Sequence, residues 1–366
     1  MVRKPVDTAF LLTTSALVVV GLLIFTSAAL GLLARDGGAS FTSVAVSQLL
    51  LGMVCGGIFS YFLSRIDYRL WRQYTPYLFG FALLLTLLTF VPHVGLTLKG
   101  ASRWISLGPI SFQPSELLKF ATVAFLAAMY ASHYKQVGTW RWGILPLILI
   151  AGSATLMVLR QPDTASAMVI ALSAVAMLFT AGGKLSHLVI LALVGVSLVG
   201  FAAYERPYVA ERLYTFINQG ADPQGAGWQI QQSLISVGSG GLFGRGFGQS
   251  IEKFSYLPEP IGDSIFAVAG EEFGFVGSGI LIGLFVAFAV LGLRIAARAA
   301  DPFGGLLAVG IVVLIVGQSF FNIASTLGLV PLVGVPLIFV SHGGTALAVA
   351  LIEVGVLLSV SRRMKK

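Results

Sequence analysis

A few ionisable side chains lie within the apolar stretches of this 366-residue chain, and each is a candidate for chemistry because a charge in lipid is costly. They are Glu116, Lys119, Glu271, Glu272 and Glu353. Glu116 and Lys119 stand three residues apart, so on a helix they share a face and can pair. Two interpretations stay open: the pair ties a bundle together, or its polar face lines a water-filled cavity near the external surface.

Asp263 is the second candidate, because it follows a proline- and glycine-containing segment, residues 256–262, and precedes a long apolar run. This is an N-cap position, so one interpretation is that Asp263 caps the next helix. The other is that its carboxylate acts as a general base at the external membrane face. A helix N-terminus favours the ionised carboxylate, so the two roles are compatible.

Other polar features carry weaker signals. The glycine-rich stretch 238–248 lacks a complete GxGxxG and a Walker lysine, so we expect tight turns and close backbone packing there and no nucleotide. Arg245 within it is available to an anionic group. Gln318 and Asn322 stand four apart, which is typical of hydrogen bonding between helices. The single cysteine and the four scattered histidines form no metal motif, and a lone histidine such as His342 is more often structural than catalytic.

The elements that must position these residues are transmembrane helices. The chain is 57% hydrophobic and only 10% charged, against about 25% charged in soluble domains. We therefore predict an all-α polytopic membrane protein with about ten spans. They are residues 9–33, 42–64, 76–92, 114–133, 143–159, 164–181, 185–203, 263–293, 303–329 and 343–361. The eighth is too long for a simple span, so its first turns should stand above the membrane or line a cavity.

Charge patterning orients this array. Lysine and arginine are concentrated in the short loops on the side of both chain ends, which predicts cytoplasmic termini. The net charge of +8 is thus a topology signal, and no nucleic acid is expected. One long external loop, about 204–262, joins the seventh and eighth spans. Its aromatic residues favour an ordered surface structure within a single membrane domain, residues 1–366.

Several segments, in order along the chain, are similar to those of a known family. They are Gly100–Ile105, Phe112–Lys119, Gln161–Asp163, Gln231–Ile235, Gly238–Leu242, Tyr256–Glu259, Asp263–Gly277 and Ser341–Thr345. On these the chain resembles the shape, elongation, division and sporulation (SEDS) peptidoglycan glycosyltransferases, the FtsW, RodA and SpoVE group. The resemblance is specific and covers essentially the whole chain, and Gly248–Ser250 ahead of Lys253 is more like the FtsW branch. Two departures stand out: Ile261-Gly262 replaces the usual His-Thr, and Ala165 replaces a glycine.

The resemblance implies an enzyme of the bacterial cytoplasmic (inner) membrane that polymerises lipid II into a β-1,4 glycan at the external face. Asp263 would be the general base. Arg103 and Lys119 would face the pyrophosphate leaving group, and Glu116, Arg245, Glu259, Ser341 and His342 would complete the substrate site. The expected cofactor is a divalent cation, Mg²⁺ or Mn²⁺, with ligands unknown. Membrane lipid and a class B penicillin-binding protein, a transpeptidase, are the expected partners.

Two other functions stay open at this point: a lipid II flippase, with Glu116 and Lys119 lining the path, and a non-catalytic scaffold for a transpeptidase. The intact Asp263 argues against the scaffold. The sequence does not distinguish roles in division, elongation and sporulation, nor the donor site from the acceptor site.

Overall fold

The computed structural model describes residues 5–34, 41–98, 101–107, 110–205, 207–218 and 225–365. Its long helical segments are α1 (Thr8–Leu30), α2–η2–α3 (Phe41–Val46, Ser47–Cys55, Gly56–Arg65), α4 (Trp71–Leu88), α5 (Pro114–Ser132), η5–η6–α6 (Trp140–Ile144, Leu147–Gly152, Ser153–Arg160), α7 (Thr164–Thr180), α8 (Leu185–Glu205), α12 (Ile265–Ala297), α13 (Pro302–Thr326) and α14 (Gly344–Ser361). Each predicted span coincides with one of these segments. Six of them are long and apolar enough to cross a membrane, so the chain is a polytopic membrane protein.

Shorter elements connect the bundle. They are η1 (Gly31–Ala34), η3 (Tyr68–Leu70), η4 (Tyr134–Gln136), α9 (Pro207–Ile217), α10 (Ala226–Ser239), α11 (Glu252–Ser255) and the strands β1 (Gly95–Leu98), β2 (Ala101–Leu107) and β3 (Ile110–Phe112). The strands form one antiparallel sheet in the order β1-β2-β3, so the all-α prediction was wrong in this detail. Outside the lipid a connection can pair its backbone groups in a hairpin instead of a helix. The predicted external loop is largely helical, with residues 206 and 219–224 outside the described part.

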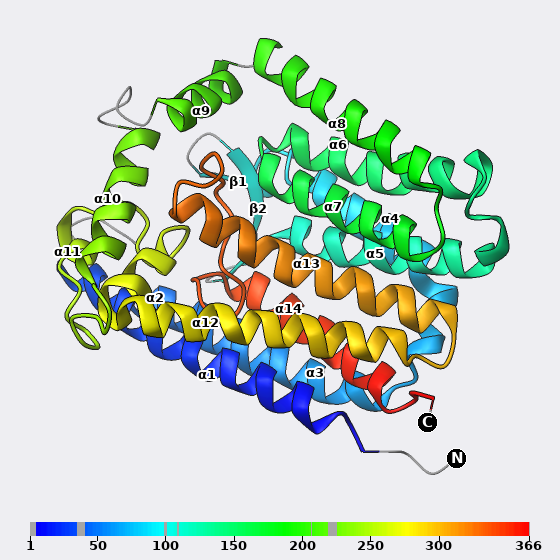
Figure 1. Cartoon of the computed structure of the whole chain (residues 1–366), viewed down its shortest axis with the longest axis horizontal. Coiled ribbons are helices and arrows are strands. Elements are labelled where there is room, and N and C mark those ends of the chain that lie inside the picture. The colour runs from blue at the N-terminus through cyan, green and yellow to red at the C-terminus, as the bar shows by residue number, and fades with distance from the viewer. Residues whose placement is uncertain are drawn as a thin grey trace.

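The helices α13 and α14 form the centre of the bundle. The apolar window of α14 is 89% buried and that of α13 is 72% buried, whereas that of Phe41–Arg65 is only 22% buried. In Figure 1, α14 lies beside α3, α12 and α13. The helices α5 and α7 also pack against α13. The polar residues of α13 therefore face protein and not lipid, as a hydrogen-bonding role requires.

The two ends of the bundle differ in character. At one end, called the terminal end, the backbone N–H of Asp7 donates to Ser361 at 3.2 Å and Arg69 pairs with Asp301 at 2.9 Å. The N- and C-termini lie together there (Figure 1). The opposite end, called the loop end, carries the sheet, α9–α11 and the segment 330–343 that precedes α14. Asp263 belongs to the loop end because it immediately precedes α12.

The long helix α12 is broken at Gly274, whose backbone is non-helical with φ 65° and ψ −164°. The glycine-rich turn after α10 completes the interrupted hydrogen bonding. Phe275 and Val276 donate to the carbonyls of Gly241 and Leu242 at 2.9 and 3.0 Å. Residues 275–297 alone have the length of an ordinary span of ~20 residues. The overlong eighth span is thus explained by a separate first part that packs against the loop.

Candidate functional site

Asp263 ends a tight turn at the loop end. Glu259 begins the turn in the left-handed region with φ 47°, and its carbonyl accepts hydrogen bonds from the N–H groups of Gly262 and Ser264 at 3.0 and 3.2 Å. Helix α12 starts at Ile265 with Ser264 at its N-cap position. The interpretation that Asp263 caps this helix was therefore wrong, because the turn places it one residue too early. Its side chain is half-buried at the surface of the bundle.

The end of α13 holds the backbone of Asp263. The side-chain amide of Asn322 donates to the Asp263 carbonyl at 2.9 Å and to the Val335 carbonyl at 2.7 Å, and Thr326 approaches the same Asp263 carbonyl at 3.4 Å. The carboxylate itself lies against Gly334, where an added Cβ would be 3.1 Å from Asp263 Oδ2. Asp263 is therefore positioned by α13 and by the segment 330–343 together.

Ser341 and His342 hold the same turn from the other side. The Ser341 hydroxyl donates to the Gly262 carbonyl at 2.8 Å and accepts from the backbone N–H of Leu337 at 2.8 Å. The backbone N–H of His342 donates to the Ile261 carbonyl at 2.7 Å. These contacts use backbone carbonyls of residues 261 and 262. The replacement of His-Thr by Ile261-Gly262 therefore leaves the bonds that shape the turn available.

The His342 ring is largely enclosed. It stacks on Phe25 of α1 with ring centroids 6.2 Å apart, and its Nε2 is buried with no hydrogen-bond partner among the described residues. Burial lowers the pKa of His342, and the nearby Glu259 carboxylate only partly opposes that shift. The ring is thus held neutral, beside the turn that carries Asp263.

Glu116 and Lys119 are paired in the core of the bundle. Lys119 Nζ lies 2.9 Å from Glu116 Oε1 and 2.5 Å from Gln318 Oε1 of α13. The cavity beside them, which Glu353 also lines, has a volume of about 10 Å³, room for roughly one water. The polar face therefore lines only this small cavity, since α13 and α14 fill the space around it, and the pair also ties the helices together.

The polar residues of α13 link this pair to Asp263. Gln318 binds Lys119 through its oxygen and donates through its nitrogen to the Pro336 carbonyl at 3.2 Å. Asn322, one turn further along α13, bonds the next carbonyl, that of Val335, and also Asp263. The predicted bonding between helices is confirmed for Gln318. The two side chains together fix the irregular segment after α13, whose backbone would otherwise be unsatisfied.

Arg103 lies on β2 and contacts the segment between α6 and α7. Its Nε donates to the Gln161 carbonyl at 2.9 Å, a second nitrogen bonds the Pro162 carbonyl, and Nη1 lies 4.0 Å from Asp163 Oδ2. Asp163 caps α7 by accepting from the Ser166 N–H at 3.0 Å. The structure thus brings Arg103 together with Gln161–Asp163, a pairing that the sequence analysis did not predict.

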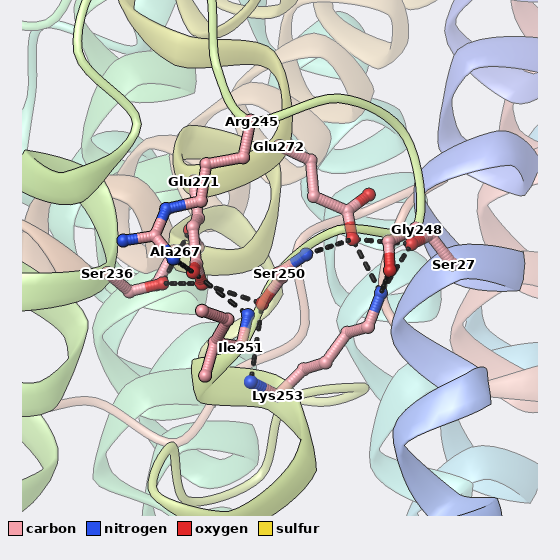
Figure 2. Close-up of polar contacts among 10 residues, drawn as sticks. All are labelled: Ser27, Ser236, Arg245, Gly248, Ser250, Ile251, Lys253, Ala267, Glu271 and Glu272. Atoms are coloured by element: carbon pink, nitrogen blue, oxygen red, sulfur yellow. Dashed lines mark hydrogen bonds and ion pairs between the residues drawn. The ribbon is translucent and has the colours of Figure 1, made fainter.

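Two buried carboxylates at the start of α12 anchor the loop that leads to Asp263 (Figure 2). Glu271 accepts from Ser250, Ser236 and the Ile251 N–H at 2.6, 3.1 and 2.9 Å, and Arg245 approaches it at 3.5 Å. Both Glu271 and Glu272 lie just before the break at Gly274. Their backbone carbonyls also accept hydrogen bonds, Glu271 from the Arg245 N–H and Glu272 from the Gly246 N–H, both at 3.0 Å. Arg245 is therefore engaged with α12, with its side chain 37% exposed.

Lys253 is a buried structural residue that the sequence analysis did not single out. Its side chain is completely buried, and Nζ contacts Glu272 at 2.6 Å, Gly248 O at 2.9 Å and Ser27 of α1 at 3.0 Å (Figure 2). A charge of this kind persists in the core only when it is paired and hydrogen-bonded. The sequence feature that could have indicated this pairing is a loop lysine followed by two glutamates, Glu271 and Glu272, inside the next apolar run.

The described residues contain no group of three His, Cys, Asp or Glu side chains that could hold a metal ion. A site for the expected Mg²⁺ or Mn²⁺ built only of protein side chains therefore does not fit these residues.

Comparison with known proteins decides the family. The family model described as cell cycle protein, FtsW/RodA/SpoVE, matches residues 7–366. The chain belongs to the FtsW, RodA and SpoVE family. It is 41% identical to stage V sporulation protein E of Bacillus subtilis over 318 residues, which are 87% of each chain. It is 39% identical to a probable peptidoglycan glycosyltransferase FtsW of Geobacter sulfurreducens over 302 residues, covering 82% and 81% of the two chains.

The family assignment extends to the fold. A chain from a peptidoglycan synthase complex, described as coordinating polymerization and crosslinking, superimposes with a TM-score of 0.80 at 25% identity, with 98% of both chains covered. This FtsW/RodA/SpoVE chain therefore shares the membrane fold of the family along its whole length, and the resemblance inferred from the motifs is confirmed.

Proposed function

We propose that this protein is a peptidoglycan glycosyltransferase that polymerises lipid II into β-1,4 glycan strands, with Asp263 as general base. The observation that carries the proposal is a half-buried carboxylate on a turn held from two directions, by Asn322 and by Ser341, at the loop end of a membrane bundle. The names of the FtsW relatives support the reaction class. A bundle in lipid also suits a substrate whose polyprenyl chain stays in the membrane.

In the proposed reaction the 4-hydroxyl of one saccharide attacks the anomeric carbon of another. Asp263 takes the hydroxyl proton as the new C–O bond forms, and the bond to the polyprenyl pyrophosphate breaks. Inversion at the α-linked donor gives the β-1,4 linkage. General base catalysis of this kind contributes about 10²–10⁴ in rate. A carboxylate that lies against Gly334 and is fixed through its own backbone is preorganised for this step.

The leaving pyrophosphate needs cations. Among the predicted residues, Arg103 and Arg245 have side chains 24% and 37% exposed, whereas Lys119 is 4% exposed and neutralised by Glu116. We therefore assign pyrophosphate contact to Arg103 and Arg245, and helix tethering to Lys119. Glu259, which is exposed beside Asp263, and the Ser341–His342 segment line the saccharide side.

The membrane arrangement follows from the same proposal. The ten helical segments are all spans, the terminal end faces the cytoplasm and the loop end faces outward from the bacterial inner membrane. The excess of lysine and arginine in the short loops at the terminal end supports this orientation.

The proposed partner is a class B penicillin-binding protein that crosslinks the new strands. The support is the structural match to a chain of a complex described as coordinating polymerization and crosslinking. The elements of the loop end, α9–α11 and the turns that join them, offer a surface for such a partner.

No observation favours the two alternatives. A flippase path along Glu116 and Lys119 would need an open passage, and the cavity there holds roughly one water. A scaffold would not need the preorganised Asp263.

One experiment separates the three functions. The purified protein, alone and with its transpeptidase, is given lipid II in detergent, and glycan strands are resolved by electrophoresis. We expect strands from the wild type. A protein that is folded and complexed yet makes no strands, while it moves lipid II across vesicles or only recruits the transpeptidase, would overturn the proposal.

A further inference from the structure

A lipid-accessible groove lies at the terminal end, far from the Asp263 turn. It has a volume of about 350 Å³ and is lined mainly by Phe79, Phe125, Met129, Arg141, Trp142 and Leu149. The volume is within the range of small-ligand sites, roughly 300–1,000 Å³. The groove opens between α4, α5 and η5–η6, and Arg141 is the only charged residue among those that line it.

The position of the groove follows from its neighbours. Arg72 at the start of α4 donates to Ser132 at the end of α5 at 3.0 Å. The α5 helix starts at the loop end, where the Gln113 N–H contacts Thr345 at 3.3 Å, so Ser132 and the groove lie at the other end. Leu145 and Leu149 on the groove wall are 47% and 61% exposed, which in a membrane protein means contact with lipid.

The rim of the groove is positively charged, and none of the described residues that line it is acidic. The chain contains no Asp or Glu between Glu116 and Asp163, and none between Asp163 and Glu205. The described residues give Arg141 no carboxylate partner. Its guanidinium lies 5.5 Å from the ring of Trp142, which stacks on His133 with centroids 3.5 Å apart.

Other basic groups at the terminal end add to this excess of positive charge. Lys135 and Lys184 lie in the two loops that meet at Gly138, where an added Cβ would be 3.8 Å from Lys184. The nearby carboxylates are engaged elsewhere, Asp301 with Arg69 at 2.9 Å and Asp67 with Arg363 at 3.1 Å. The Arg141 head group is therefore available to an anionic ligand.

We propose that this groove binds an anionic phospholipid, with the headgroup phosphate at Arg141 and an acyl chain along the apolar wall. The charged rim at Arg141 matches the anionic headgroup of such a lipid, and the apolar wall matches its acyl chain. Basic pockets between helices at the membrane surface recognise anionic headgroups. Tryptophan residues such as Trp142 are enriched at the depth of these headgroups. A zwitterionic lipid would fill the wall but would leave the charge of Arg141 uncompensated. This site is separate from the proposed polymerase site and does not depend on it.

The test measures lipid retention by the full chain. The protein is placed in nanodiscs of equal parts phosphatidylglycerol and phosphatidylcholine. Native mass spectrometry then counts the lipids of each kind that stay bound when the protein is released from the nanodisc. We expect the wild type to keep phosphatidylglycerol preferentially. Arg141→Gln should lower that preference about fivefold, since one basic residue at an anionic surface is worth ~1 kcal/mol.

Two matched variants make the result specific. Arg294→Gln removes an exposed arginine of α12 at the same end but outside the groove, and should leave the preference unchanged. Leu149→Trp fills the apolar wall and should reduce retention of both lipids. Equal retention of the two lipids by the wild type, or equal losses in Arg141→Gln and Arg294→Gln, would overturn the proposal in favour of diffuse surface charge. If Arg141→Gln does not fold, equal retention of the two lipids by the wild type would still overturn the proposal.

Discussion

The side-chain amide of Asn322 donates a hydrogen bond of 2.9 Å to the backbone carbonyl of Asp263. The same nitrogen donates to the Val335 carbonyl at 2.7 Å, beside the Gly334 that the Asp263 carboxylate contacts. One side chain of the central helix α13 therefore sets the position of the proposed base and of the wall against which it lies. Residues far apart in the sequence form the site because α13 lies at the centre of the bundle, with 72% of its apolar window buried.

Replacement of Asn322 tests this dependence. Asn322→Ala removes both bonds and leaves two carbonyls less well satisfied, so we expect a loss of stability of about 1–3 kcal/mol and a larger relative loss of glycan polymerisation. Ser319→Ala on the same helix is the control, because the Ser319 hydroxyl only bonds the Ile315 carbonyl within α13. Rates at matched folded fractions separate the two effects. Equal rates for both variants would contradict the positioning role.

Gly334 gives a sterically defined test of the carboxylate position. A Cβ at Gly334 would lie 3.1 Å from Asp263 Oδ2, so Gly334→Ala should displace the carboxylate by a few tenths of an ångström. We expect polymerisation to fall roughly tenfold or more while unfolding temperature changes little, because misplaced catalytic groups lose rate steeply. Gly283→Ala is the control, since nothing lies within 4 Å of its added Cβ. A fully active Gly334→Ala would show that the carboxylate need not stay there.

The buried pair of Lys253 and Glu272 should be a major stabilising tie between the loop and α12. Lys253→Met leaves a buried carboxylate without its cation, which typically costs about 3–5 kcal/mol. Adding Glu272→Gln removes that charge, so the double variant should recover part of the lost unfolding temperature. Thermal unfolding in detergent measures both. The absence of any recovery in the double variant would mean that the charge pair is not the source of the loss.

We expect the stability of the protein to depend on pH through Asp301 at the terminal end. Burial alone would raise the pKa of Asp301, but hydrogen bonds from Tyr68, the Gly304 N–H and Arg69 outweigh it and the pKa is lowered. A lowered folded-state pKa gives stability that is present above the unfolded value of about 3.9 and is lost as pH falls through the folded value. Asp301→Asn should therefore lower the unfolding temperature at pH 7, and the difference from wild type should shrink below about pH 4. A difference that stays constant with pH would contradict this.

The long helices were predictable because apolar run length reports them directly: α7 runs from Thr164 to Thr180, where 164–181 was predicted. The break in α12 was not, because Gly274 is one of many glycines and only the partner carbonyls of Gly241 and Leu242 make a break there favourable. The polar character of Gln318 and Lys119 was visible in the sequence, but their contact depends on packing between helices 199 positions apart. Asp263 was correctly expected just before the eighth helix, but α12 begins at Ile265 with Ser264 at the N-cap, one residue later than the predicted cap.

Polymerisation of lipid II by the purified protein with Asp263→Asn tests the central claim most directly. The substitution keeps the size of the side chain and leaves the backbone carbonyl that Asn322 and Thr326 bind, so fold and partner binding should persist. We predict that the rate of glycan-strand formation falls by about 10²–10⁴ relative to wild type. Strand formation at the wild-type rate by folded, complexed Asp263→Asn would contradict the assignment of Asp263 as the base.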